Sequence, residues 1–291
     1  MSQNYVILTD SCSDLSLTQV QEMGLDVIPL TVDFKGQSYK HYPDERALKI
    51  VDFYNEMRNK VVATTTLINA AEYLEFFEKH LEAGKDILYI AFSSGLSGSY
   101  QSSILARTEL LEKYPDRKIM IVDSKSASMG QGLLVWYAYQ QKAKGLDLEA
   151  LTKWVEDNKL KLCHIFTVDD LGTLRRGGRL STAKALIGSL LKVKPILHVD
   201  DEGKLIPIAK ARGRKTSLQK MVDLINEQII NPKEQTIFIS HGDDEEDAHY
   251  IGTLIQDQIG VKDIVYGYIG PIIGAHSGPK TIAVFYMGNQ R

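Results

Sequence analysis

The chain has 291 residues, enough for two ordinary domains or one large α/β domain. With 34 Lys and Arg against 37 Asp and Glu, its formal net charge of −3 gives no overall attraction to nucleic acid or anionic lipid. No apolar run approaches the roughly 18 residues of a membrane span, and the first ten residues do not resemble a signal peptide. We therefore expect a cytoplasmic protein with no nucleic acid partner and at most transient membrane contact, and any polyanion binding would have to come from a local basic patch.

Short apolar segments alternate with amphipathic helical patterns through the first half of the chain. We predict strands at residues 5–9, 25–32, 87–92 and 118–124, and helices at residues 46–59, 70–84 and 102–114. This alternation predicts an α/β fold with a mainly parallel sheet flanked by helices. Ligands bind beyond the carboxyl ends of such strands, so Asp10, Ser93 and Asp123, which follow or end strands, are expected to converge on one crevice.

The second half of the chain has a different pattern of predicted helices, strands and turns. Two further helices, at residues 128–145 and 147–160, lead to a strand near residue 164. Beyond it we predict a hairpin turn at "DDEGK", a strand and helix within residues 236–260, and a final strand at residues 281–286. We divide the chain into an N-terminal α/β domain, 1–162, and a smaller C-terminal α/β domain, 163–291. Whether the last strand returns to the first domain stays open.

Two segments rich in hydroxyl groups precede predicted helices. In "ATTTLIN", Thr64, Thr65 and Thr66 exceed what one helix cap needs, so either one of them caps the helix or at least one faces a ligand. In "SSGLSGSY", residues 93–100, Gly95 allows backbone N–H groups to approach an anion closely. A phosphate-binding P-loop would need a Lys that this segment lacks. The segment therefore favours an anion held by neutral donors.

Histidine and cysteine residues limit the chemistry further. His276 lies in a Gly/Ser/Pro-rich segment predicted to be a loop, where its ring can donate a hydrogen bond to an anion. His164, inside an apolar strand, is interpreted as structural. Cys12 and Cys163 are the only cysteines, and neither has a partner at metal-binding spacing. We expect no disulfide framework, no metal and no cofactor.

Two basic clusters are the strongest local positive charges. They are "LRRGGR", with Arg175, Arg176 and Arg179, and "KARGRK", with Lys210, Arg212, Arg214 and Lys215. Each is either a solvated surface, a phosphate or RNA contact, or a docking surface for an acidic partner. Walker, dinucleotide-binding, zinc-protease and nucleophile-elbow motifs are absent from the sequence. Two alternatives to an anion-binding protein stay open. One is a hydrolase or transferase acting on a small phosphate or carboxylate ester, with Asp10, Asp123 and His276 as acid/base groups, and the other is a nucleic-acid-binding regulator using the two basic clusters.

Several separated motifs together resemble one family. They are "TDSCSDL", "VIPLTV", "TTTLIN", "SSGLSGSY", "VDSKSASMGQG", "LRRGGRL", "KPIL" and "IGAHSGP", in this order. The chain resembles the DegV family, bacterial fatty-acid-binding proteins that include the lipid-carrying subunits of fatty acid kinase. One segment departs from the family pattern Thr-Ser-Gln-Pro-Ser, because Thr64 is followed by Thr65, Thr66 and Leu67.

The resemblance implies a non-catalytic protein with a long-chain fatty acid between its two domains. The anion would be the fatty acid carboxylate, which a kinase subunit that binds ATP converts to acyl phosphate for phospholipid synthesis. Together with the positions of the residues after predicted strands, it assigns the carboxylate to Thr64, Thr65, Ser93, Ser94, Gly95 and His276. The apolar segment 185–191 is either core or tunnel wall, and we predict that Leu186, Ile187 and Leu190 line the acyl tunnel. Arg212, and less directly Arg176, are predicted to dock the kinase subunit.

Overall fold

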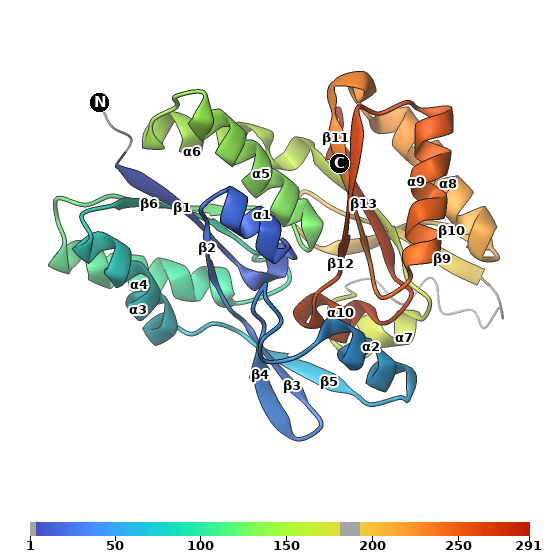
Figure 1. Ribbon diagram of the computed structural model, residues 1–291, viewed down its shortest axis with the longest axis horizontal. Helices are drawn as coiled ribbons and strands as arrows, with labels where there is room; N and C mark the ends of the chain where they lie inside the picture. Colours follow the sequence, from blue (N-terminus) through green and yellow to red (C-terminus); the bar gives the residue numbers. More distant parts are fainter. Residues whose placement is uncertain (1–3, 181–192) are drawn as a thin grey trace.

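The computed structural model describes residues 4–180 and 193–291, which form three β-sheets surrounded by helices (Figure 1). The predicted tunnel residues Leu186, Ile187 and Leu190 lie outside the described residues.

The first sheet has four parallel strands in the order β2-β1-β6-β7. Its strands are β1 (Tyr5–Asp10), β2 (Asp26–Ile28), β6 (Asp86–Ala91) and β7 (Ile119–Asp123). Flanking it are α1 (Leu17–Glu22), α3 (Ala70–Glu82), α4 (Ser99–Lys113), α5 (Met129–Ala143) and α6 (Leu148–Asn158), with α3 and α4 on one side and α5 and α6 on the other (Figure 1). Cover on both faces explains why β6 is a continuous apolar run. The predicted parallel sheet with flanking helices is confirmed.

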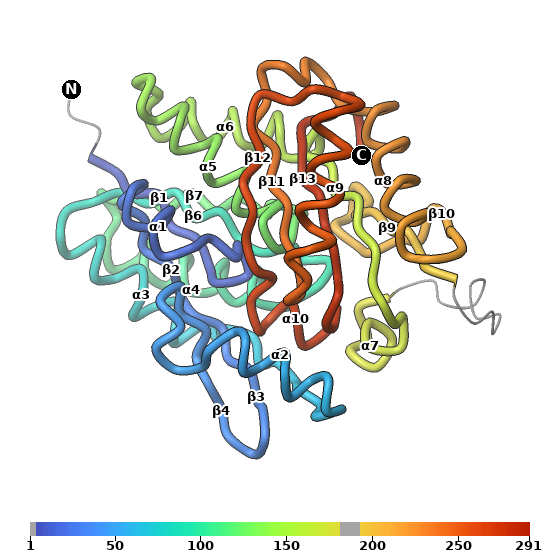
Figure 2. The backbone as a smooth tube through the Cα atoms, turned by 45° about the vertical axis from the view of Figure 1, so that its right-hand side comes forward, coloured from blue at the N-terminus to red at the C-terminus, as the bar shows by residue number. Residues whose placement is uncertain are grey.

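The second sheet is mixed and has the strand order β10-β9-β8-β13-β11-β12. Its strands are β8 (Leu162–Thr167), β9 (Val193–Val199), β10 (Leu205–Arg212), β11 (Thr236–His241), β12 (Asp263–Tyr268) and β13 (Ile282–Met287). Its helices are α7 (Leu171–Arg176), α8 (Arg214–Gln228), α9 (Glu245–Gln258) and α10 (Pro271–Ser277). The last strand, β13, pairs with both β8 and β11, and its Met287 pairs with Leu162 at the start of β8. Figure 2 shows β13 beside β11.

Side-chain alternation along β8 separates two hydrophobic cores. Leu162 and Phe166 belong to the core shared with the first sheet, whereas Cys163 and Ile165 belong to the core under α8 and α9. Because successive side chains of a strand point to opposite faces, one strand contributes to both cores. The helix α5 lies between the two sheets and contacts both, so the face of the second sheet that it covers is turned toward the first.

A small third sheet was not predicted. It is antiparallel and consists of β3 (Thr31–Phe34), β4 (Gln37–Lys40) and β5 (Ala63–Thr66). The helix α2 (Ile50–Arg58) lies between β4 and β5 in the sequence. The prediction of one strand over residues 25–32 is wrong, because the chain leaves the first sheet at Pro29 and enters the third sheet at Thr31. Proline has no N–H to donate to a ladder, which favours a break at this point.

Two other predictions of local structure also differ. The three threonines of "ATTT" do not cap α3, because they form β5 and Asn69 caps the helix by accepting a hydrogen bond from the N–H of Glu72 at 3.0 Å. His276 lies in the last turn of α10 rather than in a loop. Pro271 occupies the first helical position there, where its missing N–H costs nothing. The predicted hairpin turn around Gly203 is confirmed between β9 and β10.

Across the described ranges 4–180 and 193–291, none of the helices is long and apolar enough to cross a membrane.

Candidate functional site

A cavity lies between the first and second sheets and is lined by residues from both halves of the chain. Most of its lining is apolar, including Leu30, Phe92, Phe166, Val199, Ile272 and Phe285. Phe92 directly follows β6, so the cavity meets the carboxyl end of the parallel sheet, where ligands of such sheets bind. No acidic side chain is among the described residues that line it.

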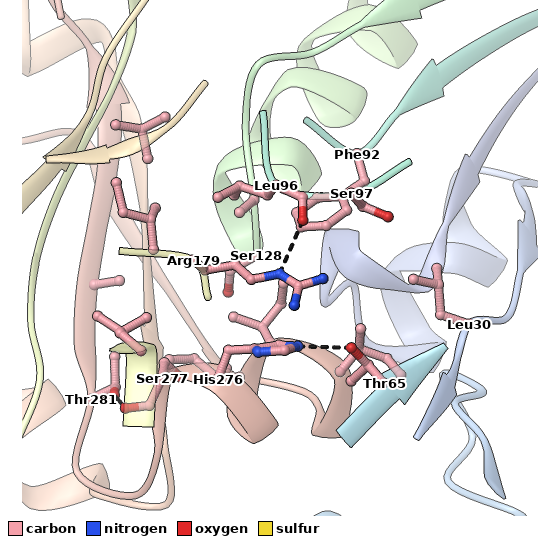
Figure 3. A pocket seen from close by; sticks show the side chains of 18 of the residues that line it. Leu30, Thr65, Phe92, Leu96, Ser97, Ser128, Arg179, His276, Ser277 and Thr281 are labelled. Atoms are coloured by element: carbon pink, nitrogen blue, oxygen red, sulfur yellow. Dashed lines mark hydrogen bonds between the residues drawn. The ribbon is translucent and has the colours of Figure 1, made fainter. Parts of the chain in front are cut away.

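One part of the cavity wall is polar. The Thr65 hydroxyl lies 2.7 Å from Nε2 of His276, in a hydrogen bond that joins β5 to α10. The guanidinium group of Arg179 lies between this pair and Leu96 (Figure 3). Its Nε donates to the carbonyl oxygen of Leu96 at 3.1 Å, and a second nitrogen donates to the carbonyl oxygen of Gly177 at 2.5 Å. A hydroxyl, an imidazole and a guanidinium therefore share one end of an apolar cavity.

The charges at this end suit an anion. Burial, together with the positive charge of Arg179, lowers the pKa of His276 to about 4, so its imidazole is neutral at pH 7. The Nδ1 atom of His276 is buried and has no hydrogen-bond partner among the described residues. A carboxylate would bring negative charge beside Arg179 and would accept hydrogen bonds from the nearby donors.

The pKa of His276 predicts a pH dependence of stability. Because the folded-state pKa of about 4 lies below the ordinary 6.5, the unfolded chain takes up a proton that the folded chain does not. This contribution is fully present above pH 6.5 and is lost as the pH falls toward 4, at about 1.4 kcal/mol per pH unit. In urea denaturation of the ligand-free protein, His276→Gln should reduce the slope of unfolding free energy against pH over this range. His249→Gln, which removes an exposed histidine, is the control; equal slopes for wild type and His276→Gln would contradict the assignment.

The other residues assigned to the carboxylate lie near the cavity but do not line it. Ser93 is fully buried, and its hydroxyl donates to the carbonyl oxygen of Gly203 at 2.8 Å. The Ser93 hydroxyl oxygen also accepts from the N–H of Gly95 at 3.1 Å, and the Ser94 hydroxyl accepts from Nζ of Lys125 at 2.8 Å. A Cβ on Gly95 would lie 2.6 Å from the carbonyl oxygen of Glu202. The glycine therefore lets the β9–β10 turn approach this loop.

Thr64 and Thr65 lie in different surroundings although they are adjacent. Thr65 lines the cavity, whereas Thr64 is exposed in a groove that also contains Arg176 and Lys280. This groove adjoins the cavity, since Thr65 and His276 line both. The carboxylate assignments of Thr64, Ser93, Ser94 and Gly95 stay predictions.

Asp10 and Asp123 hold backbone at the ends of the parallel strands. Asp10 is fully buried and accepts from the N–H groups of Cys12 at 3.0 Å and Phe92 at 2.9 Å, and from the Tyr89 hydroxyl at 2.8 Å. Burial raises the pKa of Asp10. Asp123 accepts from the N–H of Ser94 at 3.1 Å, and although burial opposes ionisation, its hydrogen bonds lower its pKa. Neither carboxylate lines the cavity, which disfavours a hydrolase using them with His276.

The arginines of the two basic clusters lie in different surroundings. Arg179 lines the cavity, and Arg214 forms ion pairs with Asp244 at 2.9 Å and Asp247 at 2.5 Å. Arg212 and Arg176 are exposed, Arg212 at the end of β10 and Arg176 in α7. The clusters are therefore not uniform solvated patches of the kind that a nucleic-acid backbone would need. Among residues 4–180 and 193–291, no group of His, Cys, Asp and Glu could hold a metal ion.

Sequence reasoning did not assign Arg179 to the site. Of its cluster only Arg176 is assigned a role, and a run of arginines does not indicate which one points inward. Gly177 was also missed, although a Cβ there would lie 2.2 Å from Nδ1 of His276. A useful signal is present in the sequence: Gly177 and Gly178 follow α7 directly, where two small residues permit close packing against another element.

Comparison with known proteins places the fold and this site in context. A family model described as an uncharacterised protein of the DegV family matches residues 4–289. The chain belongs to the DegV family. A DegV domain-containing protein of Clostridium perfringens is 46% identical over 289 residues, covering 99% of both chains. This membership confirms the resemblance carried by the separated motifs.

Solved structures of DegV proteins share the whole fold. A fatty-acid-binding DegV family protein from Thermus thermophilus matches with a TM-score of 0.88 and 26% identity, covering 98% of this chain and 99% of its own. DegV from Bacillus subtilis, described as a fatty acid binding protein, matches with a TM-score of 0.83 and 30% identity, covering 99% and 100%. Coverage of this extent means that the cavity lies in a fold shared by proteins that bind fatty acids.

Proposed function

We propose that this protein binds a long-chain fatty acid, with the carboxylate beside Thr65, His276 and Arg179 and the acyl chain along the apolar wall. The observation that carries the proposal is an apolar cavity whose polar end holds a cation and neutral donors and, among the described residues, no acid. Fatty acid binding by the relatives from Thermus thermophilus and Bacillus subtilis supports it.

The two parts of the ligand would contribute differently. Burial of about fourteen methylene groups at about 0.8 kcal/mol each gives roughly 11 kcal/mol before ordering costs. A hydrogen bond to a charged group contributes about 1.5–3 kcal/mol. The acyl chain therefore dominates affinity, while the polar end fixes orientation and penalises ligands that leave its donors unpaired.

We expect protein purified from cells to carry lipid of fatty acid mass, measured by native mass spectrometry. In titrations of delipidated protein, Thr65→Val should weaken binding about tenfold, because one hydrogen bond to the carboxylate is lost. Thr64→Val is the matched comparison, since it makes the same change on the neighbouring, exposed residue. The variant with the larger loss identifies the threonine that contacts the ligand.

The absence of co-purifying lipid, together with no binding of added fatty acid by correctly folded protein, would overturn the proposed function. Turnover of simple esters by the purified chain would favour the hydrolase instead.

The same arrangement suits a carrier that acts without chemistry of its own. The carboxylate end adjoins the groove containing Thr64, Arg176 and Lys280, so a bound carboxyl group would lie close to a surface that a second protein could cover. In this proposal the chain presents the carboxyl group to a separate ATP-binding kinase subunit, which forms the acyl phosphate. Arg212 and Arg176, both exposed, would contact that subunit.

Arg212→Ala should leave fatty acid binding intact while weakening phosphorylation of the bound lipid in a reconstituted assay. The physical reason is that exposed charges orient association with an acidic partner, an effect that salt screens, so the difference between Arg212→Ala and wild type should shrink as the salt concentration rises. Lys118→Ala removes an exposed charge at the start of β7, at the opposite end of the parallel strands, and is the control. Loss of the lipid from the Arg212 variant would assign this residue to ligand binding instead.

A further inference from the structure

His164 is a polar side chain in the apolar part of the cavity wall. It lies on β8 between Leu162 and Phe166, on the strand face that turns toward the first sheet, and it lines the cavity. Only 2% of its surface is exposed. Its ring packs edge-on against that of Phe285, with centroids 5.4 Å apart and an interplanar angle of 89°. His164 is therefore fixed in the wall by its packing.

The ring makes no direct hydrogen bond to the described residues, although it interacts weakly with the backbone carbonyl group of Leu162. Both of its nitrogens are buried and unpaired. Burial, assisted by the positive charge of Arg291, lowers the pKa of His164 well below its ordinary value, although the carbonyl group of Leu162 opposes this slightly. The imidazole is consequently neutral, with one N–H donor and one acceptor nitrogen. Ser128, another polar residue of the cavity wall, differs because its hydroxyl donates to Asp14 at 2.6 Å.

A trapped water is a poor partner for this histidine. A buried water needs two to four polar partners, because each missing hydrogen bond costs free energy. The side chains of Phe166 and Phe285 offer none, and the Nε2–Cδ2 edge of the ring faces Gly130, where an added Cβ would lie 2.4 Å from Nε2. Because this packing covers Nε2, a polar group carried into the cavity by a ligand would pair with Nδ1.

The strand register places His164 away from the polar end of the cavity. β13 begins five residues after α10 ends at Ser277, and its Ala283 and Phe285 face the cavity. Ala283 pairs with Phe166, whereas Phe285 pairs with His164. His164 thus lies two residues farther from the polar end of the cavity than Phe166, a distance of roughly 7 Å along the strand. It would meet the hydrocarbon chain of a ligand rather than its carboxylate.

We propose that His164 makes the cavity selective for fatty acids that carry a hydroxyl group on the acyl chain. This inference rests on the proposed fatty acid binding and names the ligand class within it. A hydroxyl both donates and accepts a hydrogen bond, as does a neutral imidazole. A plain acyl chain leaves the ring unpaired, as it is in the ligand-free protein, and gains no hydrogen bond there, whereas a hydroxyl does.

The test is a titration of delipidated full-length protein with stearic acid, oleic acid and a series of hydroxystearic acids that bear the hydroxyl at different carbons. The measured quantity is the ratio of hydroxystearic acid affinity to stearic acid affinity. For at least one hydroxystearic acid, this ratio should be about tenfold larger in wild type than in His164→Phe. His198→Phe makes the same chemical change on β9, at a residue that does not line the cavity, and should keep the wild-type ratio.

An equal ratio of hydroxystearic to stearic acid affinity in wild type and His164→Phe would overturn the inference, and stearic acid binding in the same titrations would show that the proposed function stands. A change in the preference for oleic acid alone would also overturn it. If His164→Phe does not fold, the ring nitrogen resonances of ¹⁵N-histidine-labelled wild type decide: a shift at His164 with a hydroxystearic acid but not with stearic acid supports the inference, and no difference refutes it. Failure of wild type to bind any of these acids would instead refute the proposed function, and the inference with it.

Discussion

Replacement of Arg291 by methionine is expected to lower the free energy of unfolding by about 3–5 kcal/mol. The guanidinium group of Arg291 donates hydrogen bonds of 2.6–3.1 Å to the backbone carbonyl oxygens of Lys125, Lys159, Leu162 and Asp200. Burial lowers the pKa of Arg291 to about 10, so the group stays charged at neutral pH. Methionine fills similar space but leaves buried carbonyl groups unpaired.

Urea denaturation measures this loss. Arg291→Lys keeps the charge but cannot reproduce the planar set of donors, so its stability should fall between those of wild type and Arg291→Met. Arg46→Met is the control, because Arg46 is exposed and its ion pair with Asp44 is a surface pair worth at most about 1 kcal/mol. Equal losses in the Arg291 and Arg46 variants would show that the buried contacts of Arg291 contribute little.

The position of Arg291 connects stability to the ligand site. Lys125 and Asp200, two of its acceptors, belong to the loop after β7 and the turn between β9 and β10. The same turn receives the hydrogen bond from Ser93, and Ser93 in turn donates its N–H to the carbonyl oxygen of Ser126. Arg291 thus holds together the segments that support the loop between β6 and α4, whose Leu96 and Ser97 line the cavity.

Much of the fold could be predicted because local pattern and global structure agree. The apolar run of β6 indicates a strand buried on both faces, and the amphipathic helices between such runs indicate crossover connections. The third sheet could not be predicted in this way. Its strands are three or four times shorter than the predicted helices and are half-exposed, and the chain changes sheets at Pro29 inside one apolar segment. Pairing between distant segments decides such strands, and local sequence carries little information about it.

The sequence indicated which residue types form the site better than it indicated which side chains point into the cavity. His276 was assigned to the carboxylate, and the structure brings its ring to Thr65. Thr64 has the same side chain as Thr65 and Thr66 but lies outside the cavity that these two line, so residue type alone does not show which threonine reaches the ligand. Arg179 was missed for a related reason, since only the packing of the turn after α7 separates it from the exposed Arg176.

Gly177→Ala should weaken fatty acid binding about tenfold while leaving the protein folded. A Cβ at this position would lie 2.2 Å from Nδ1 of His276, so the ring must move away, and its 2.7 Å contact with Thr65 would be lost. The backbone of Gly177 has φ near −73°, which alanine adopts without strain. Loss of one charge-assisted hydrogen bond to the carboxylate accounts for the expected factor, measured by titration of delipidated protein.

Gly178→Ala is the matched control because it should give the opposite result. Gly178 has φ of +68°, where alanine is strained by about 1 kcal/mol, but no atom of residues 4–180 or 193–291 lies within 4 Å of the added Cβ. This variant should lose stability and keep its affinity for fatty acid, whereas Gly177→Ala should lose affinity. A double-mutant cycle with His276→Phe then tests the cause. If Gly177→Ala acts by displacing the imidazole, it should cost no further affinity once the imidazole is absent; additive losses would show that Gly177 affects binding by another route.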